Sequence, residues 1–97
     1  MNEIYEINNK KYKLIKEYKE GFDKETVESL LTDYFFDFDY VFGDWAYSKL
    51  RLKGFYKHDN KLRKDYNDYN KVDDYINNNC AYGCKYFILE KLVEKQK

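Results

Sequence analysis

Alternating apolar and polar residues mark the segment 49–56, which begins Lys-Leu-Arg-Leu-Lys. On a β-strand this period of two places Leu50 and Leu52 on one face and the three cations on the other. The short apolar run 40–42 comes before it, and a chain reversal among residues 43–48 would pair the two segments antiparallel. We therefore predict a hairpin with one face in the core and the other in solvent.

Two further patterns predict three more strands. Segments 3–7 and 11–18 alternate around Asn8-Asn9-Lys10, and Asn tolerates the left-handed backbone of a tight turn. They should form a first hairpin. The run 86–89 is apolar in succession, which is typical of a strand buried on both faces near the middle of a sheet.

Three- and four-residue spacing of apolar side chains predicts an amphipathic helix over about 24–36, with Asp23 as its N-cap. A second, short helix should begin at Asn70 and end before Gly83. Together these elements predict an α+β fold. It contains an antiparallel sheet of about five strands, made of two hairpins and a C-terminal strand, covered by the amphipathic helix.

The 97 residues are expected to form a single domain, 1–97, with a charged tail at 93–97 that frays. Net charge is zero, from 18 basic and 18 acidic residues, which argues against a general, charge-driven nucleic-acid binder. The distribution is uneven: seven acids accompany one Lys over 23–44, and seven bases accompany one Asp over 49–64. Either the basic block is a binding surface, or the two blocks neutralise each other across the fold.

The basic strand face is the first candidate site. Period two also puts the ring of Phe55 on this face, where cations can bind phosphate while the ring stacks on a base. The polar segment 57–70 lacks lasting periodicity, so we predict a mobile loop whose cations adjoin the face. A solvated face is the simpler alternative, because antiparallel sheets commonly expose Lys and Arg on one side. The candidate nucleic-acid-binding residues are Lys49, Arg51, Lys53, Phe55, Lys57, Lys61, Arg63 and Lys64.

Other residues carry weaker hypotheses. Asp44 could cap the turn of the second hairpin, and Trp45 could belong to the core. His58 has no recognisable partner and is expected to be an ordinary surface residue. Cys80 and Cys84 are interpreted as free thiols, with inert burial, redox or sensing chemistry, or a zinc site shared with a second chain as the alternatives.

No apolar run approaches the roughly 20 residues of a membrane span, and the N-terminus lacks the pattern of a signal peptide. We expect a cytosolic protein that does not bind membranes, with no metal, no cofactor and no enzymatic activity. The leading hypothesis is a binding module for RNA or another nucleic acid. A protein-interaction adaptor is the alternative, and a thiol-dependent redox or sensing protein is the third. The sequence does not indicate the oligomeric state.

Two blocks of residues resemble a known family. The block 39–45 reads Asp-Tyr-Val-Phe-Gly-Asp-Trp and is followed by Leu-Arg-Leu-Lys-Gly-Phe at 50–55, while 80–87 reads Cys-Ala-Tyr-Gly-Cys-Lys-Tyr-Phe. Their order and spacing resemble the YutD-like family of small bacterial proteins, over about residues 12–92. The resemblance implies a small α+β domain and a regulatory role without an assigned mechanism. The residues that match the family motif are Gly43, Asp44, Trp45, Gly54 and Gly83.

Overall fold

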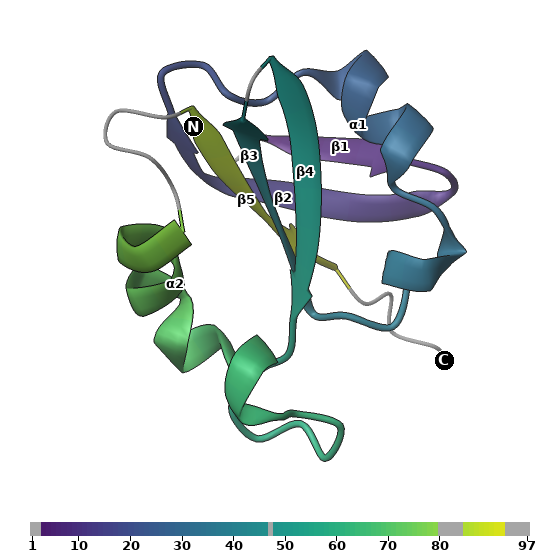
Figure 1. Cartoon of the computed structure of the whole chain (residues 1–97). Helices are drawn as coiled ribbons and strands as arrows, with labels where there is room; N and C mark the ends of the chain where they lie inside the picture. Colours follow the sequence, from purple (N-terminus) through teal and green to yellow (C-terminus); the bar gives the residue numbers. More distant parts are fainter. Residues whose placement is uncertain (1–2, 47, 80–84, 93–97) are drawn as a thin grey trace.

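The computed structural model describes residues 3–46, 48–79 and 85–92 and contains a five-stranded antiparallel sheet in the order β1-β2-β5-β3-β4 (Figure 1). The two predicted hairpins are β1–β2 and β3–β4, and β5 pairs with β2 and β3 at the centre of the sheet. This confirms the predicted α+β class. The strands are β1 (Ile4–Ile7), β2 (Lys10–Tyr18), β3 (Tyr40–Ala46), β4 (Lys49–Phe55) and β5 (Tyr86–Lys91).

Helices cover both faces of the sheet, with α1 (Lys24–Leu30) on one side and α2 (Val72–Asn79) on the other (Figure 1). Adjacent residues of a strand point to opposite faces. Val41 therefore joins the core under α1, and Phe42 joins a second core under α2. The prediction that one face of the second hairpin lies in solvent is wrong, because α2 packs over part of that face.

The first helix is shorter than predicted. It begins after Asp23, at the expected N-cap, but the helix ends at Leu30 and a separate 3₁₀ turn, η1, follows at Asp33–Phe35. The side-chain amide of Asn8 donates a 2.6 Å hydrogen bond to the carbonyl oxygen of Leu31. A residue of the β1–β2 turn thus satisfies a carbonyl group at the end of the helix.

The second hairpin turns at the end of the predicted interval 43–48, and its first strand is longer than predicted. Strand β3 continues through Gly43 to Ala46, and Ala46 pairs with Lys49 across a two-residue connection. Gly43 lies within β3, and the ring of Phe87 lies against its backbone. A Cβ atom built at Gly43 would be 2.2 Å from this ring. Close approach of a ring, not a chain reversal, explains this glycine.

The remaining turns agree with the sequence in position. Asn8 and Asn9 have positive φ values of 53° and 69°, as the first hairpin requires. The second helix is confirmed, but Asn70 does not cap it: the carboxylate of Asp68 accepts a 3.0 Å hydrogen bond from the Asn70 amide. Segment 57–70, whose mobility stays a prediction, contains η2 (Asp65–Asn67) and the start of η3 (Tyr69–Lys71). The predicted helix end at Gly83 and the tail 93–97 lie outside the described residues.

Among the described residues, no helix is both long enough and apolar enough to cross a bilayer.

Candidate functional site: a groove at the free edge of β4

The predicted basic face is divided by an ion pair. Asp44 lies directly opposite Arg51 in the β3–β4 ladder, and Arg51 donates hydrogen bonds of 2.6 and 3.2 Å to its two carboxylate oxygens. The hydrogen bonds and the charge of Asp44 raise the pKa of Arg51. Asp44 is 2% exposed and lies within a strand, so the interpretation of this residue as a turn cap is wrong. It neutralises a central cation instead.

Lys53 and Phe55 do not form an exposed cation and ring. Phe55 is 1% exposed and packs in the core under α2, which corrects the prediction of a free aromatic face. The Lys53 ammonium lies 5.2 to 5.7 Å from the ring centres of Phe55, Tyr66 and Tyr75. Burial among these rings lowers the pKa of Lys53. The ring that was predicted to stack on a base is covered by the protein itself.

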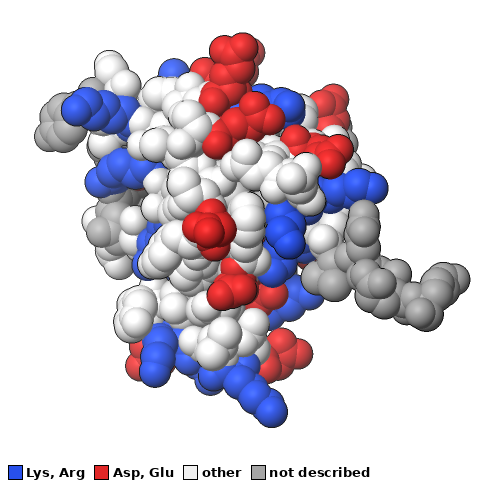
Figure 2. Space-filling view, turned by 90° about the vertical axis from the view of Figure 1, so that its right-hand side faces the viewer, with Lys and Arg blue, Asp and Glu red and all other residues white. Residues whose placement is uncertain are grey.

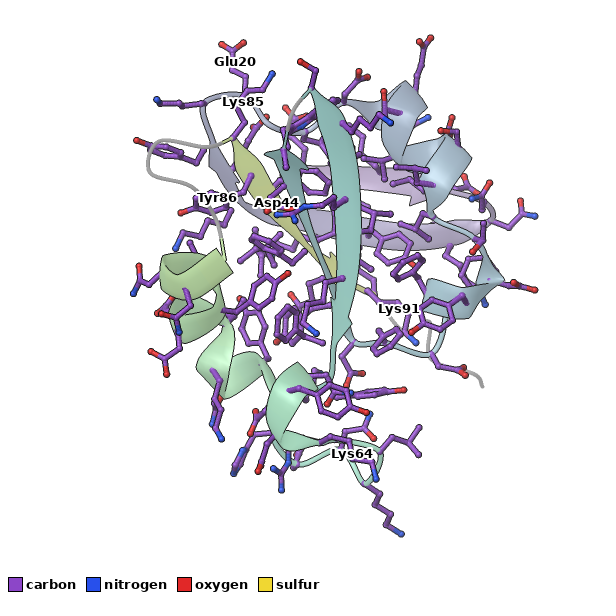
Figure 3. All side chains as sticks on the ribbon, in the orientation of Figure 1. Glu20, Asp44, Lys64, Lys85, Tyr86 and Lys91 are labelled. Carbon is purple, nitrogen blue, oxygen red and sulfur yellow. The ribbon has the colours of Figure 1, made fainter. Side chains whose placement is uncertain are left out.

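The loop cations are dispersed. Arg63 lies 3.4 Å from the buried carboxylate of Asp68, and His58 Nδ1 lies 2.9 Å from the same oxygen. The expectation that His58 has no partner is therefore wrong. Lys57, Lys61 and Lys64 are exposed. Figure 3 shows Lys64 on the loop below β4, well separated from Asp44 at the middle of the sheet.

Trp45 and Gly54 have structural roles. Trp45 packs against the core under α1, and its indole N–H donates a 2.7 Å hydrogen bond to the carbonyl oxygen of Gly21, so its core interpretation is confirmed. Gly54 lies under the ring of Phe38, and a Cβ atom on Gly54 would be 2.2 Å from that ring. The predicted thiols Cys80 and Cys84, together with Gly83, lie outside the described residues.

A groove of about 600 Å³ runs along β4 on the side away from β3. One wall comes from segment 33–38, the other from segment 62–67, and Leu52, Gly54 and Tyr56 lie between them. Figure 2 shows the side of the molecule on which α1 lies in Figure 1, with uncharged surface that is interrupted by acidic side chains near the middle and with Lys and Arg side chains at the lower end. The full lining is Asp33, Tyr34, Phe35, Asp37, Phe38, Leu52, Lys53, Gly54, Tyr56, Leu62, Lys64, Tyr66 and Asn67.

Exposed apolar side chains gather at this groove. Tyr34 is 69% exposed, Leu62 58% and Tyr66 70%, and all three line it. They come from both walls, which are about 30 residues apart in the sequence. Large apolar side chains that are left in water around one concave surface are typical of a binding site.

The groove adjoins the free edge of the sheet. In the part of the chain that the structure describes, β4 pairs with β3 alone. The Trp45 amide donates a hydrogen bond to the carbonyl oxygen of Lys85, on the β5 side of β3. Successive residues of a strand direct their main-chain groups to opposite sides, so the register of the β3–β4 ladder directs those of Arg51 and Lys53 toward β3. Those of Leu50, Leu52 and Gly54 consequently point outward, away from the sheet. The site therefore combines exposed aromatic rings with the unpaired edge of β4, at which Gly54 is buried.

Sequence reasoning named Lys53, Gly54 and Lys64, which line the groove, but missed its exposed apolar residues. Tyr34 was assigned to the apolar stripe of a longer helix, whereas the helix ends early and the side chain lies in solvent. Leu62 was the available signal, because it is an isolated large apolar residue in a polar segment. The segment's lack of periodicity gave no indication of which surface it would border.

The fold is that of a small α+β domain, in which a five-stranded antiparallel sheet carries a helix on each face. Comparison with known proteins agrees. A family model described as "Putative antitoxin YutD-like" matches residues 6–90, and the chain belongs to this family. The resemblance predicted from the two sequence blocks is confirmed.

A sequence comparison and a structure comparison support this assignment. The chain is 35% identical over 86 residues to "Putative antitoxin YutD" of Bacillus subtilis (strain 168), covering 89% of this chain and 94% of the relative. The solution NMR structure of protein yutD from B. subtilis superposes with a TM-score of 0.79 at 32% identity. That match covers 98% of this chain and 86% of the other.

Proposed function

We propose that this chain is a protein-binding module that holds a partner protein in an inactive complex, as an antitoxin does. The observation that carries the proposal is the convergence of Tyr34, Leu62 and Tyr66 on one groove. Tyr is enriched where protein surfaces bind each other, because its ring contributes apolar area at a small cost in side-chain entropy. The word antitoxin in the relative's name favours a protein to be counteracted as the partner. This role requires no catalytic step and no cofactor.

The test is capture of a partner from lysate by the tagged chain, before and after nuclease treatment. The double variant Tyr34→Ser/Tyr66→Ser removes two rings from the groove, and Tyr18→Ser is the matched control because Tyr18 is 43% exposed and does not line the groove. We expect a protein that survives nuclease, is retained by the control and is lost with the double variant. Expression of that protein alone should slow growth, and co-expression of this chain should restore it. Capture that is unchanged in the double variant would refute the role of the groove.

Nucleic-acid binding is the second candidate, and the exposed side chains of Lys57, Lys61 and Lys64 favour it. Such binding would rest on phosphate contacts and would therefore weaken steeply with salt. Titration of labelled RNA pools at low and high salt tests it, with the triple Lys→Gln variant as the comparison. Salt-sensitive binding that the triple variant loses, together with nuclease-sensitive capture, would favour this candidate over the protein partner.

A further inference from the structure

We propose that the groove receives an extended segment of the partner protein as an added strand beside β4, and that apolar and acidic side chains alternate along this segment. The inference rests on the proposed function and specifies how the partner would be recognised. Main-chain hydrogen bonds to a free edge supply affinity in this mode of binding, while alternate side chains supply specificity.

The first support is the open edge itself. The outward main-chain groups of Leu50 and Leu52 lie two residues apart on the same edge, and Leu52 lines the groove, whereas Gly54 is buried. An incoming strand needs this spacing, because residues i and i+2 of a strand present their amide and carbonyl groups in the same direction. Leu52 lies where the groove walls would flank an added strand.

The second support is that another segment of this chain forms main-chain hydrogen bonds at the end of this edge. Just beyond β4, the Tyr56 amide donates a 2.7 Å hydrogen bond to Asn67, and the Tyr69 amide donates a 2.9 Å bond to the Tyr56 carbonyl. These bonds form a parallel bridge between Tyr56 and Asp68. A segment of this chain therefore pairs with the end of the edge, and among the described residues no strand pairs with the edge at Leu50 and Leu52.

The third support is the difference between the two walls. Side chains of an added strand would point alternately to the α1 side and to the α2 side of the sheet. On the α1 side they would meet Leu52 and the rings of Tyr34 and Phe38, with Asp33 and Asp37 nearby. Apolar side chains suit that wall, and acidic side chains would be repelled there.

On the α2 side the same strand would meet cations. Lys49, Arg51 and Lys53 lie on this face of β4, and Lys64 lines the groove. Arg51 is paired with Asp44, and Lys53 lies among three rings in a pocket that Asp65 and Asp74 also line. The exposed Lys49 and Lys64 are therefore the cations available to the incoming strand. Acidic side chains complement this wall, so a segment in which apolar and acidic residues alternate would match both walls.

Charge also argues against a second copy of this chain as the occupant. If two β4 strands paired antiparallel about Leu52, Arg51 of each copy would lie opposite Lys53 of the other. Like charges directly opposite each other destabilise a strand pair. Lysines on an edge strand disfavour self-association in this way and leave the edge open to an acidic partner.

The test uses fluorescent peptides of about ten residues, the length of a long β-strand. The probe alternates Ile or Val with Glu. One control has the same composition in scrambled order, a second replaces Glu with Lys, and a third carries N-methyl groups on alternate amides. We expect the probe to bind at least about tenfold more tightly than each control, because each control lacks the alternation, the charge or the main-chain donors. Hydrogen exchange should show slower exchange at the Leu50 and Leu52 amides when the probe is bound.

Leu52→Pro is the matched variant of the protein. It removes an outward amide while the ladder bonds from Arg51 and Lys53 to β3 remain. Binding should be lost while circular dichroism stays unchanged. If the variant does not fold, binding of the N-methylated peptide and hydrogen exchange, both measured with the original protein, still test the inference. Equal binding of the probe and its N-methylated or scrambled form, or no binding of the probe, overturns the inference. The proposed function would survive that result if capture from lysate still depended on Tyr34 and Tyr66, since a folded partner surface would then occupy the groove.

Discussion

Asp44 and Arg51 face each other across β3 and β4, and the guanidinium group donates two hydrogen bonds to a carboxylate that is almost fully buried. The Arg51 side chain is 52% exposed, while that of Asp44 is 3% exposed. An exposed guanidinium group therefore balances a buried negative charge. The two partners contribute unequally, because only the carboxylate would be left unsolvated if the pair were broken.

The first prediction concerns this pair. Arg51→Met keeps the apolar stem of the side chain and removes both donors from Asp44. We expect the free energy of unfolding to fall by about 2 kcal/mol, within the range for hydrogen bonds to charged groups and reduced for the exposure of Arg51. Urea denaturation followed by the fluorescence of Trp45 measures the change. The double variant Asp44→Asn/Arg51→Met should recover about half of the loss, because a neutral amide is less costly to bury. A single variant as stable as the original protein would contradict the interpretation.

The second prediction concerns Tyr12, which is 0% exposed and whose hydroxyl group has no hydrogen-bond partner among the described residues. Removal of a buried, unpaired hydroxyl relieves its desolvation, so Tyr12→Phe should stabilise the protein by about 1 kcal/mol. Thermal and urea denaturation near neutral pH measure this gain. A loss of stability would show that the hydroxyl is satisfied in solution.

The stability of the protein at alkaline pH should also depend on Tyr12. Burial raises the pKa of Tyr12 from 10.0 to about 12. Between these values the unfolded chain releases the proton and the folded chain keeps it, so stability is lost as the pH rises through this window. Tyr12→Phe should remove part of that loss. The decline should not vanish, because burial also raises the pKa of Tyr40, Tyr56, Tyr69 and Tyr75.

Local patterns in the sequence predicted most of the secondary structure. Asn8 and Asn9 identified the first turn, and the apolar run 86–89 identified the central strand, because both signals depend on neighbouring residues. Period two also gave the correct faces of β4. It could not show that α2 covers the face that carries Phe55, since packing between distant elements leaves no trace in the period of one strand.

The site depended on contacts that are distant in sequence. The groove forms where segment 33–38 and segment 62–67 reach the same edge, and neither segment has a regular hydrophobic pattern. The Asp68 carboxylate, which binds His58 and Arg63, lies in an irregular stretch where no period indicates side-chain direction. Sequence patterns therefore predicted the sheet more reliably than the surface that surrounds its free edge.

The third prediction concerns Asp68. Burial acts to raise the pKa of its carboxyl group, but hydrogen bonds from His58 and from the Asn70 amide, and the charge of Arg63, hold that pKa below 3.8. A carboxyl group with a lowered pKa in the folded state stabilises the protein above its unfolded-state pKa. This stabilisation is lost as the pH falls through the folded-state value.

Asp68→Asn should therefore lower the urea midpoint near neutral pH and reduce its decline in acid. Urea titrations at about pH 7, 5 and 3 measure both effects. Asp59→Asn is the control, because Asp59 is an exposed acid in the same loop. If the two variants had the same pH profile, the contacts of Asp68 would not stabilise the fold.

The fourth prediction compares two glycines that each lie under an aromatic ring. A Cβ atom at Gly43 or at Gly54 would be 2.2 Å from Phe87 or Phe38, respectively. Phe87 is fully buried at the centre of the sheet and has no room to move. Gly43→Ala should therefore lower the free energy of unfolding by about 3 kcal/mol, at the upper end for overpacking a core.

Gly54→Ala should lower the free energy of unfolding less than Gly43→Ala does, and it should weaken partner binding more. Phe38 is half-buried and lines the groove, so it can move toward solvent at a cost of about 1 kcal/mol. That movement would shift the ring within the groove that Leu52 also lines. The variant should therefore remain folded by circular dichroism while partner capture is lost. Gly43→Ala, studied where it is still folded, should retain capture. Loss of capture in proportion to lost stability in both variants would contradict a specific role for the edge of β4.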